Sequence, residues 1–465
     1  MVYAAAGGTV PGGTTSGGRL KWDTPVRVSS GRPRSRRPQL SNACFIRGRR
    51  HLTLRKALIT IDRIAQKRVA ASSEQSGGGG TAVTDIFRFD PVALPPACEA
   101  LRREVRAFIV EEKAAGRWRS GDDFTSTHSP DFSRRLGQRG WVGMTWPKRY
   151  GGHERSALER YVVTEELLAA GAPVGAHWVA DRQSGPLLLR FGTEAQRQEF
   201  LPRIAAGECF FCIGMSEPDS GSDLASIRSK AVPAQGGFTL TGRKIWTSNA
   251  HKAHFMIALC RTSPPEADRH HGLTQLIVDL KAPGVSTRPI RNLAGAEHFN
   301  EVVFDEVAIP GDRVIGQPGD GWKQVTSELG YERSGPERFL STFRLLAEFV
   351  RRAGPAPDDR AAETIGRFVA HLATLRRMSL SVAGMLQAGQ MVNLEAAVVK
   401  DLGTNLEREI PEMVRLVARR GRSPNHADLM EEALAIGVLN APSFTLRGGT
   451  REILRGIVAR GLGLR

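Results

Sequence analysis

The spacing of apolar residues changes twice along the chain and defines three regions after a polar leader. In the first region, residues 85–208, apolar side chains recur every three or four positions, as at Leu101 and Val105, which is the period of one helix face. Thr193 followed by Gln196 has the pattern of a capping box at a helix N-terminus. We therefore predict a helical N-terminal domain.

The second region, residues 209–320, has the period of strands. Phe238 and Leu240 alternate with Thr239 and Thr241, and turns rich in Gly and Pro separate further short apolar runs. Short strands at this spacing are typical of an antiparallel barrel or sandwich. We predict a β-domain of that kind. The chain has no GxGxxG motif between a strand and a helix, which disfavours a Rossmann fold.

The third region, residues 321–465, returns to the helical period. Ile365, Phe368 and Leu372 begin one long apolar stripe, and a second stripe follows from Leu394. Long helices joined by short loops are typical of a four-helix bundle. The predicted fold class is therefore α+β, in the order helical domain, β-domain, helical bundle.

The leader, residues 1–84, differs from the rest in composition. Residues 1–80 hold 15 Lys and Arg against three acidic residues, and so carry most of the formal net charge of +17. The Pro- and Arg-rich run at residues 32–38 is too charged to pack, and residues 77–80 are a glycine linker. We predict a disordered extension without a catalytic role. The alternatives are that the leader is a transit peptide or translated sequence upstream of the true start.

Charge, hydropathy and cysteine content limit the partners and the compartment. Because the basic residues are concentrated in the leader, we expect no nucleic-acid partner. No apolar run approaches the roughly 18 residues of a membrane span. Five cysteines without disulfide spacing favour a reducing compartment. We expect the cytoplasm of a bacterial-type cell, or mitochondria if the leader is a transit peptide. Cys209 and Cys212 form a lone CxxC, which we interpret as part of a buried strand and not as a metal site.

A polar loop follows the first helical region. Residues 214–226 hold two Gly, four Ser and three acidic residues between an apolar run and a predicted strand. Backbone N–H groups and hydroxyls at this density suit a flavin ring or a phosphate, although an ordinary surface loop is the simpler interpretation. The pattern resembles the first signature of the acyl-CoA dehydrogenase family, a Ser/Thr-Glu pair followed by Gly-Ser/Thr-Asp. Residues 242–249, Gly-Arg-Lys-Ile-Trp-Thr-Ser-Asn, are similar to the Trp segment with which that family covers its flavin.

The resemblance covers roughly residues 90–465 and implies an FAD-dependent enzyme that desaturates an acyl-CoA thioester between its α and β carbons. It also implies a glutamate base and an electron-transfer flavoprotein as partner. Many members carry the base near the C-terminus, where this chain has Gly448, which has no side chain to take a proton. Other members place it before an Arg on the first helix after the β-domain. Glu332, followed by Arg333, matches that position, and Glu337 is a second candidate. A surface Glu332 paired with a helix neighbour is the simpler alternative.

Pro336 bears on the base position, because it has no N–H to bond the Glu332 carbonyl. We expect a kinked helix, or a break with Ser334 or Gly335 as the next N-cap. By the resemblance, the backbone N–H of Gly448 helps hold the thioester oxygen, and Ser222 and Arg333 contact substrate. An ordinary core position is the alternative for Trp246. The expected flavin contacts are Ile213, Met215, Ser216, Gly221, Ser222, Trp246, Thr247, Ser248, Thr450 and Glu452.

Two segments usual in the family are absent. Residues 351–359 lack an Arg-x-x-Phe-Gly motif, and residues 429–439 lack Gln-x-x-Gly-Gly. The contacts that one subunit gives to its neighbour's FAD are therefore changed. We expect a homo- or hetero-oligomer. The alternative functions are a non-catalytic or flavin-binding partner subunit, and an acyl-CoA oxidase or monooxygenase on the same fold.

Overall fold

The structure is a computed structural model that describes residues 87–464 apart from 119, 122–125, 265–267 and 419–428, and only the backbone of residues 328–332. The described residues belong to one compact unit of the chain. The extension predicted over residues 1–84, with its linker, lies outside the described residues.

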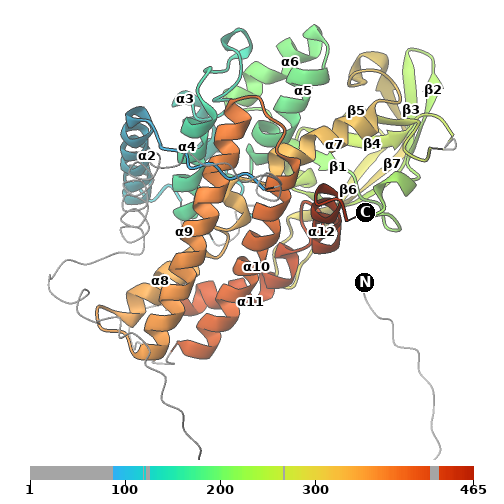
Figure 1. The fold of residues 1–465 in the computed structure, drawn as a ribbon. Helices are drawn as coiled ribbons and strands as arrows, with labels where there is room; N and C mark the ends of the chain where they lie inside the picture. The colour runs from blue at the N-terminus through green and yellow to red at the C-terminus, as the bar shows by residue number, and fades with distance from the viewer. Residues whose placement is uncertain (1–86, 119, 122–125, 265–267, 419–428, 465) are drawn as a thin grey trace, which may run out of the picture. The chain divides into compact units, whose positions relative to one another are not determined.

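The regular elements of the described chain before residue 208 are helices (Figure 1). Leu101 and Val105, which lie on the predicted apolar face, are buried. The capping box predicted at Thr193 is present, because its hydroxyl accepts from Gln196 N across 3.2 Å and the Gln196 side chain accepts from Thr193 N across 3.0 Å. The elements are α2 (Pro96–Ala114), α3 (Pro130–Gln138), η1 (Lys148–Tyr150), α4 (Ala157–Ala169), the π-helical turn η2 (Ala180–Ser184), α5 (Gly185–Phe191) and α6 (Glu194–Ala205).

One mixed sheet of seven strands follows, in the order β1-β4-β2-β3-β7-β6, with β5 pairing β4. The expectation of a purely antiparallel domain is wrong in one respect, because β1 and β2 both run parallel to β4. Strands joined by a hairpin, such as β2 and β3, must be antiparallel, whereas β1 meets β4 only after the chain has passed through that hairpin. The strands are β1 (Phe211–Gly214), β2 (Lys230–Ala234), β3 (Gly237–Ser248), β4 (Phe255–Arg261), β5 (Leu273–Asp279), β6 (Val285–Ile290) and β7 (Phe299–Pro310).

The sheet has its own apolar core. Leu240, Met256, Leu276, Val302 and Phe304 are buried together in it. Almost every residue of β4 and β5 is buried, which explains why β4 is a nearly continuous apolar run in the sequence and does not alternate.

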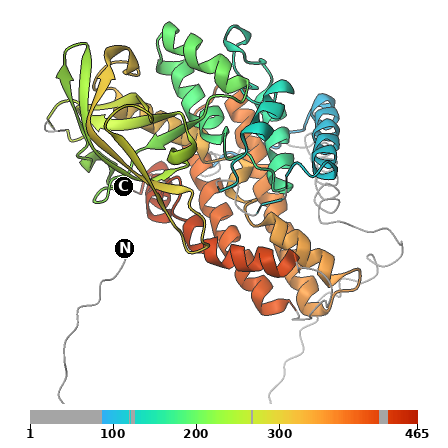
Figure 2. The same cartoon turned by 180° about the vertical axis from the view of Figure 1, so that it is seen from behind.

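The C-terminal part is helical again, and α10 packs against α9, α11 and α12 (Figures 1 and 2). The first helix of this part, α7, ends at Glu332. A 3-10 turn begins after its N-cap Gly335, so the helix is interrupted before Pro336 and does not continue with a kink. The missing proline N–H is the physical reason. The elements are α7 (Gly321–Glu332), η6 (Pro336–Arg338), α8 (Phe343–Ala353), α9 (Asp359–Gln387), α10 (Asn393–Val417), α11 (Leu429–Phe444) and α12 (Arg451–Gly461).

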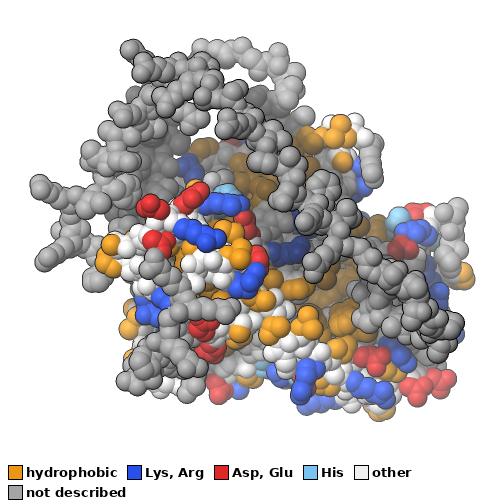
Figure 3. All heavy atoms as spheres, turned by 90° about the horizontal axis from the view of Figure 1, so that it is seen from below, with side chains coloured by type: hydrophobic (Ala, Val, Ile, Leu, Met, Phe, Trp, Pro, Cys, Tyr) orange, Lys and Arg blue, Asp and Glu red, His pale blue; other side chains and the backbone are white. Residues whose placement is uncertain are grey.

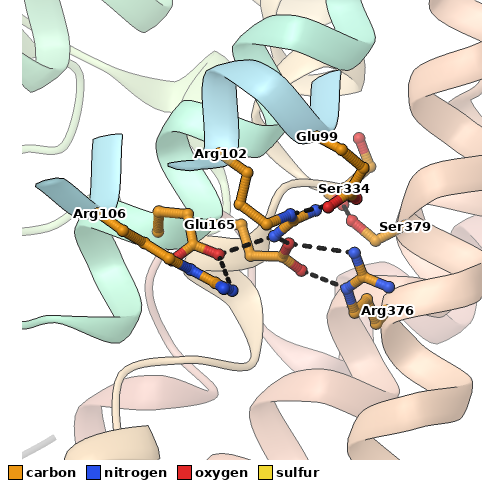
Figure 4. A network of polar contacts seen from close by, with 8 residues as sticks. Glu99, Arg102, Arg106, Glu165, Ser334, Arg376 and Ser379 are labelled. Carbon is orange, nitrogen blue, oxygen red and sulfur yellow. Dashed lines mark hydrogen bonds and ion pairs between the residues drawn. The ribbon is translucent and has the colours of Figure 1, made fainter. Parts of the chain in front are cut away.

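A buried ionic network joins the N-terminal helices to α9 (Figure 4). Arg102 on α2 donates to Glu165 on α4 across 2.7 Å, and Arg376 on α9 donates to the same carboxylate across 2.5 Å. Burial alone would raise the pKa of Glu165, but Arg376 and Arg102 lower it to about 2. On α9, Ser379 also donates its hydroxyl to the Ser334 carbonyl, so the network reaches the chain just after α7.

Candidate functional site

The loop at residues 214–226 folds back on itself. Glu217 and Ser220 exchange backbone hydrogen bonds of 2.8 and 3.0 Å. The Ser220 hydroxyl donates to the Asp223 carbonyl across 2.5 Å. On its inner side the loop is packed through Met215, which lies with Trp322 and Val325 of α7 in one apolar cluster. The loop therefore has a defined conformation and packs against the start of α7.

Lys244 on β3 holds the loop from the other side. Its side chain is fully buried, and its ammonium donates to the Met215 carbonyl across 3.1 Å and to Glu217 Oε1 across 2.9 Å. Burial alone would raise the pKa of Glu217, but Lys244 and hydrogen bonds from Ser229 and Arg228 lower it. Both residues lie within the two motifs predicted from the sequence, but no role was predicted for either. The period of β3 was an available signal, because it places Lys244 on the same face as the buried Leu240.

A β-bulge turns Trp246 outward. The pairing of β3 with β7 shifts between Lys244 and Thr247, and Trp246 takes a φ of 60°, a left-handed conformation that is strained for a large side chain. Its ring is 56% exposed and lies edge-on to Phe299, with the ring centroids 6.0 Å apart. The alternative of an ordinary core aromatic is therefore wrong, because the extra residue of the bulge reverses the alternation.

The groups around Trp246 fit a planar cofactor with hydrogen-bonding edges. The Ile245 N–H donates to the Ser216 carbonyl across 2.9 Å, which ties the Trp segment to the polar loop. The Thr247 hydroxyl is buried and has no hydrogen-bond partner among the described residues. Gly221 and Ser222 are exposed, and a Cβ on Gly221 would meet nothing within 4 Å. Ile213 and Ser248 are half-buried at the neighbouring strand ends. An exposed ring, an unsatisfied hydroxyl and open backbone suit a flavin.

A second polar centre surrounds the turn before α12. Gly448 and Gly449 take φ values of 66° and 99°, which only glycine adopts without strain. Arg333, 5% exposed, donates from Nε to the Gly448 carbonyl across 3.3 Å. Lys400, fully buried on α10, donates to the Gly449 carbonyl across 2.6 Å. The structure therefore brings together Arg333 and Gly448, which are 115 residues apart.

The remaining predicted residues take different positions. Glu332 is the last residue of α7, and its side chain lies outside the described residues. Glu337 is buried in η6, and Arg447 donates to its carbonyl across 3.3 Å. Thr450 is the N-cap of α12. Glu452 is exposed in the first turn of that helix, where its own N–H and the Thr450 hydroxyl lower its pKa.

The π-helical turn η2 is a feature that sequence reasoning missed. It contacts both β1 and α7, so it lies between the elements that carry the two polar centres. Ser184 at its end is fully buried, and its hydroxyl has no hydrogen-bond partner among the described residues. Single π-turns are frequent at functional sites. The residues of η2 carry no sequence pattern that would have predicted one.

A mixed sheet with helical regions before and after it in the chain, together with a polar loop beside an exposed tryptophan, is the arrangement expected of a flavin-dependent oxidoreductase with mixed α and β structure. Two family models match the chain: the N-terminal domain of acyl-CoA dehydrogenase over residues 95–208, and the middle domain over residues 212–307. The chain belongs to the acyl-CoA dehydrogenase family, an oxidoreductase family of flavoproteins.

Relatives from Mycobacterium tuberculosis are similar over most of the described chain. Acyl-CoA dehydrogenase FadE26 is 30% identical over 404 residues, which are 80% of this chain and 98% of FadE26. Acyl-CoA dehydrogenase FadE34 is 34% identical over 332 residues, 70% of this chain, but these span only 45% of FadE34. Among solved structures, the ChsE4-ChsE5 complex from the same species has 28% identity and a TM-score of 0.68, over 80% of this chain and 99% of that chain.

Three further findings concern other parts of the described chain. Within the described residues, no helix has the length and apolar character to cross a bilayer. Groups of three or more His, Cys, Asp or Glu arranged for a metal ion are likewise absent there. Cys209 and Cys212 are buried beside or within β1, and burial raises the pKa of Cys209 to about 11 and that of Cys212 further. Both thiols are therefore protonated and packed as small apolar groups.

Proposed function

We propose that this chain is an FAD-dependent acyl-CoA dehydrogenase that forms a double bond between the α and β carbons of an acyl-CoA thioester. Membership of the family and the polar face around Trp246 support the proposal. When bound, FAD would supply the acceptor for the β-hydride and the carrier of electrons to an electron-transfer flavoprotein. The chain's own residues would supply binding, orientation and the base.

In this proposal Glu332 is the base that takes the α-proton. The backbone N–H of Gly448 donates to the thioester oxygen and stabilises the negative charge that develops there. Where many family members carry a glutamate base, Gly448 has no side chain, but it keeps this backbone donor. Arg333 and Ser222 contact the substrate.

The observation that carries the proposal is the hydrogen bond from Arg333 to the Gly448 carbonyl. It joins the residue after the proposed base to the turn that offers the thioester donor. A substrate bound at this turn would therefore lie beside the end of α7. The proposed flavin contacts, from Ile213 to Ser248 and at Thr450 and Glu452, would face the same substrate.

A test begins with the full chain expressed alone. We expect a yellow protein whose flavin bleaches under anaerobic conditions when a matching acyl-CoA is added, with formation of the α,β-unsaturated thioester. Addition of an electron-transfer flavoprotein should restore the yellow colour. Rapid oxygen consumption in place of that transfer would favour the oxidase alternative, and a flavin that no acyl-CoA bleaches would contradict the proposal.

A second function, that of a partner subunit in a hetero-oligomer, is favoured by a separate observation. Two motifs with which family members contact a neighbouring subunit's FAD are missing from this chain. The corresponding positions, residues 351–359 and 429–439, lie between α8 and α9 and in α11. Leu402, Leu439 and Leu446 of the same part of the chain are 49%, 43% and 61% exposed. Figure 3 shows groups of hydrophobic side chains among charged ones on the face seen from below. A similar chain is known from the ChsE4-ChsE5 complex.

Flavin content separates the two functions. A chain that binds FAD only when produced together with a related acyl-CoA dehydrogenase chain would be a partner subunit. A dimer of this chain alone with bound FAD would favour the first proposal.

A further inference from the structure

We infer that the buried Glu217–Lys244 ion pair is a positioning device, which fixes the polar loop and the Trp246 segment in the geometry that holds the flavin. The inference rests on the flavin site proposed above. It assigns to Glu217 and Lys244 a task that does not require either side chain to touch the cofactor.

The pair gathers three parts of the chain at one buried point. Lys244 is 0% and Glu217 8% exposed, and their charged groups are 2.9 Å apart. The ammonium also holds the Met215 carbonyl, at the start of the loop. The carboxylate accepts from the backbone N–H groups of Arg228 and Ser229 across 2.6 and 2.9 Å, after the end of the loop. One ion pair therefore closes the loop and attaches it to β3.

The same point controls the direction of the Trp segment. Lys244 is the last residue of β3 that pairs regularly with β7 before the bulge. The next residue, Ile245, donates its N–H to the Ser216 carbonyl, and Trp246 follows in its left-handed conformation. A Cβ on Gly214 would lie 3.2 Å from the Lys244 side chain and 2.5 Å from Met256 Sδ, so this glycine makes room for the lysine stem. The loop and the bulge therefore meet at Lys244.

Stability alone does not explain such a pair. A buried ion pair gains little over apolar residues of similar volume, because both charges must leave water, and replacement by apolar residues is often neutral. Removal of one partner, by contrast, leaves an uncompensated buried charge. What the ion pair adds is direction, since its oxygen and nitrogen atoms bond each other and three defined backbone groups, which an apolar pair cannot do.

This difference defines the experiment. The full-length chain is compared with Glu217→Gln, Lys244→Met and the double variant Glu217→Leu/Lys244→Met. The matched control is Arg243→Gln/Glu301→Gln, which removes the neighbouring exposed ion pair between β3 and β7, 3.1 Å across. The readouts are the melting temperature of the apoprotein, the FAD dissociation constant from flavin fluorescence, and the rate of trypsin cleavage after Arg228.

We expect both single variants to melt at a lower temperature. The double variant should melt at a higher temperature than either single variant, because it leaves no uncompensated buried charge, yet bind FAD at least tenfold more weakly than the wild type and be cleaved after Arg228 at least tenfold faster. Arg228 is exposed, and only its N–H is held by Glu217, so cleavage reports the loop directly. The control pair should change neither quantity.

A double variant with wild-type FAD affinity and wild-type cleavage would overturn the inference, because apolar packing would then be sufficient. If the wild type itself binds no FAD, the proposed flavin site fails. The cleavage assay on the apoprotein still decides whether the pair fixes the loop, since it needs no cofactor.

Discussion

Lowering the pH from 7.5 to 5.0 should cost the folded chain about 2 kcal/mol through a single side chain, His177. Its ring is 5% exposed, and Nδ1 lies 2.8 Å from the Ser133 hydroxyl. Burial lowers the pKa of His177 to about 4; Asp181 opposes this shift and Arg182 adds to it. The folded state therefore holds the ring neutral far below the pH at which an unfolded histidine binds a proton.

The direction in which stability changes with pH follows from the pKa values of His177 in the unfolded and folded states. Unfolded, the imidazole titrates near 6.5; folded, near 4. Above pH 6.5 the ring is neutral in both states and its stabilising contribution is complete. As the pH falls toward 4 the unfolded state binds the proton first, so stability is lost through this window. At pH 5.0, about 1.5 pH units below the unfolded value, at about 1.4 kcal/mol per unit, the loss is about 2 kcal/mol.

Urea unfolding of the wild type and of His177→Gln at both pH values measures this loss of unfolding free energy. Glutamine does not titrate and can keep the hydrogen bond to Ser133, so the variant should lose about 2 kcal/mol less than the wild type over the same window. His271→Gln, which removes an exposed ring, is the matched control. Equal losses in the wild type and His177→Gln would refute the reasoning.

Three further outcomes are expected. Ser379→Ala removes the hydroxyl that donates to the Ser334 carbonyl, and the resulting misplacement of the proposed base, Glu332, should slow flavin reduction about tenfold. Thr374→Ala, which removes a hydroxyl bonded only within α9, should have no effect, and equal rates in both variants would remove Ser379 from the account. A chain that starts at Thr81 should remain soluble and yellow, and a colourless product would show that the leader is needed. Sedimentation should give at least a dimer, which a tight FAD-binding monomer would contradict.

The apolar periods were sufficient to predict the helical and strand regions, because burial of one face imposes 3.6- and 2-residue repeats directly on the sequence. The same reasoning could not predict that β1 would run parallel to β4, since strand direction depends on the path of the chain between them. The end of α7 was predictable from Pro336, because a missing N–H is a local property.

The candidate site was harder to predict, for reasons that concern particular residues. Strict alternation along β3 would place Trp246 on the buried face with Lys244, and only the bulge between them reverses this. Lys244 itself is a charge on an inward-facing position, which becomes reasonable only when Glu217 arrives from a different segment. The approach of Arg333 to Gly448 joins residues 115 positions apart, which no local pattern encodes.

The measurement that tests the central claim most directly is anaerobic, rapid-mixing reduction of the bound flavin by acyl-CoA in the wild type and in Glu332→Gln. The amide preserves shape and hydrogen bonding but cannot take the α-proton, and a positioned base contributes about 10² to 10⁴ in rate. We expect the variant to stay yellow, bind acyl-CoA and reduce its flavin at least about 10²-fold more slowly, while Glu337→Gln remains close to the wild type. Near-normal reduction in Glu332→Gln would place the base elsewhere and contradict the account.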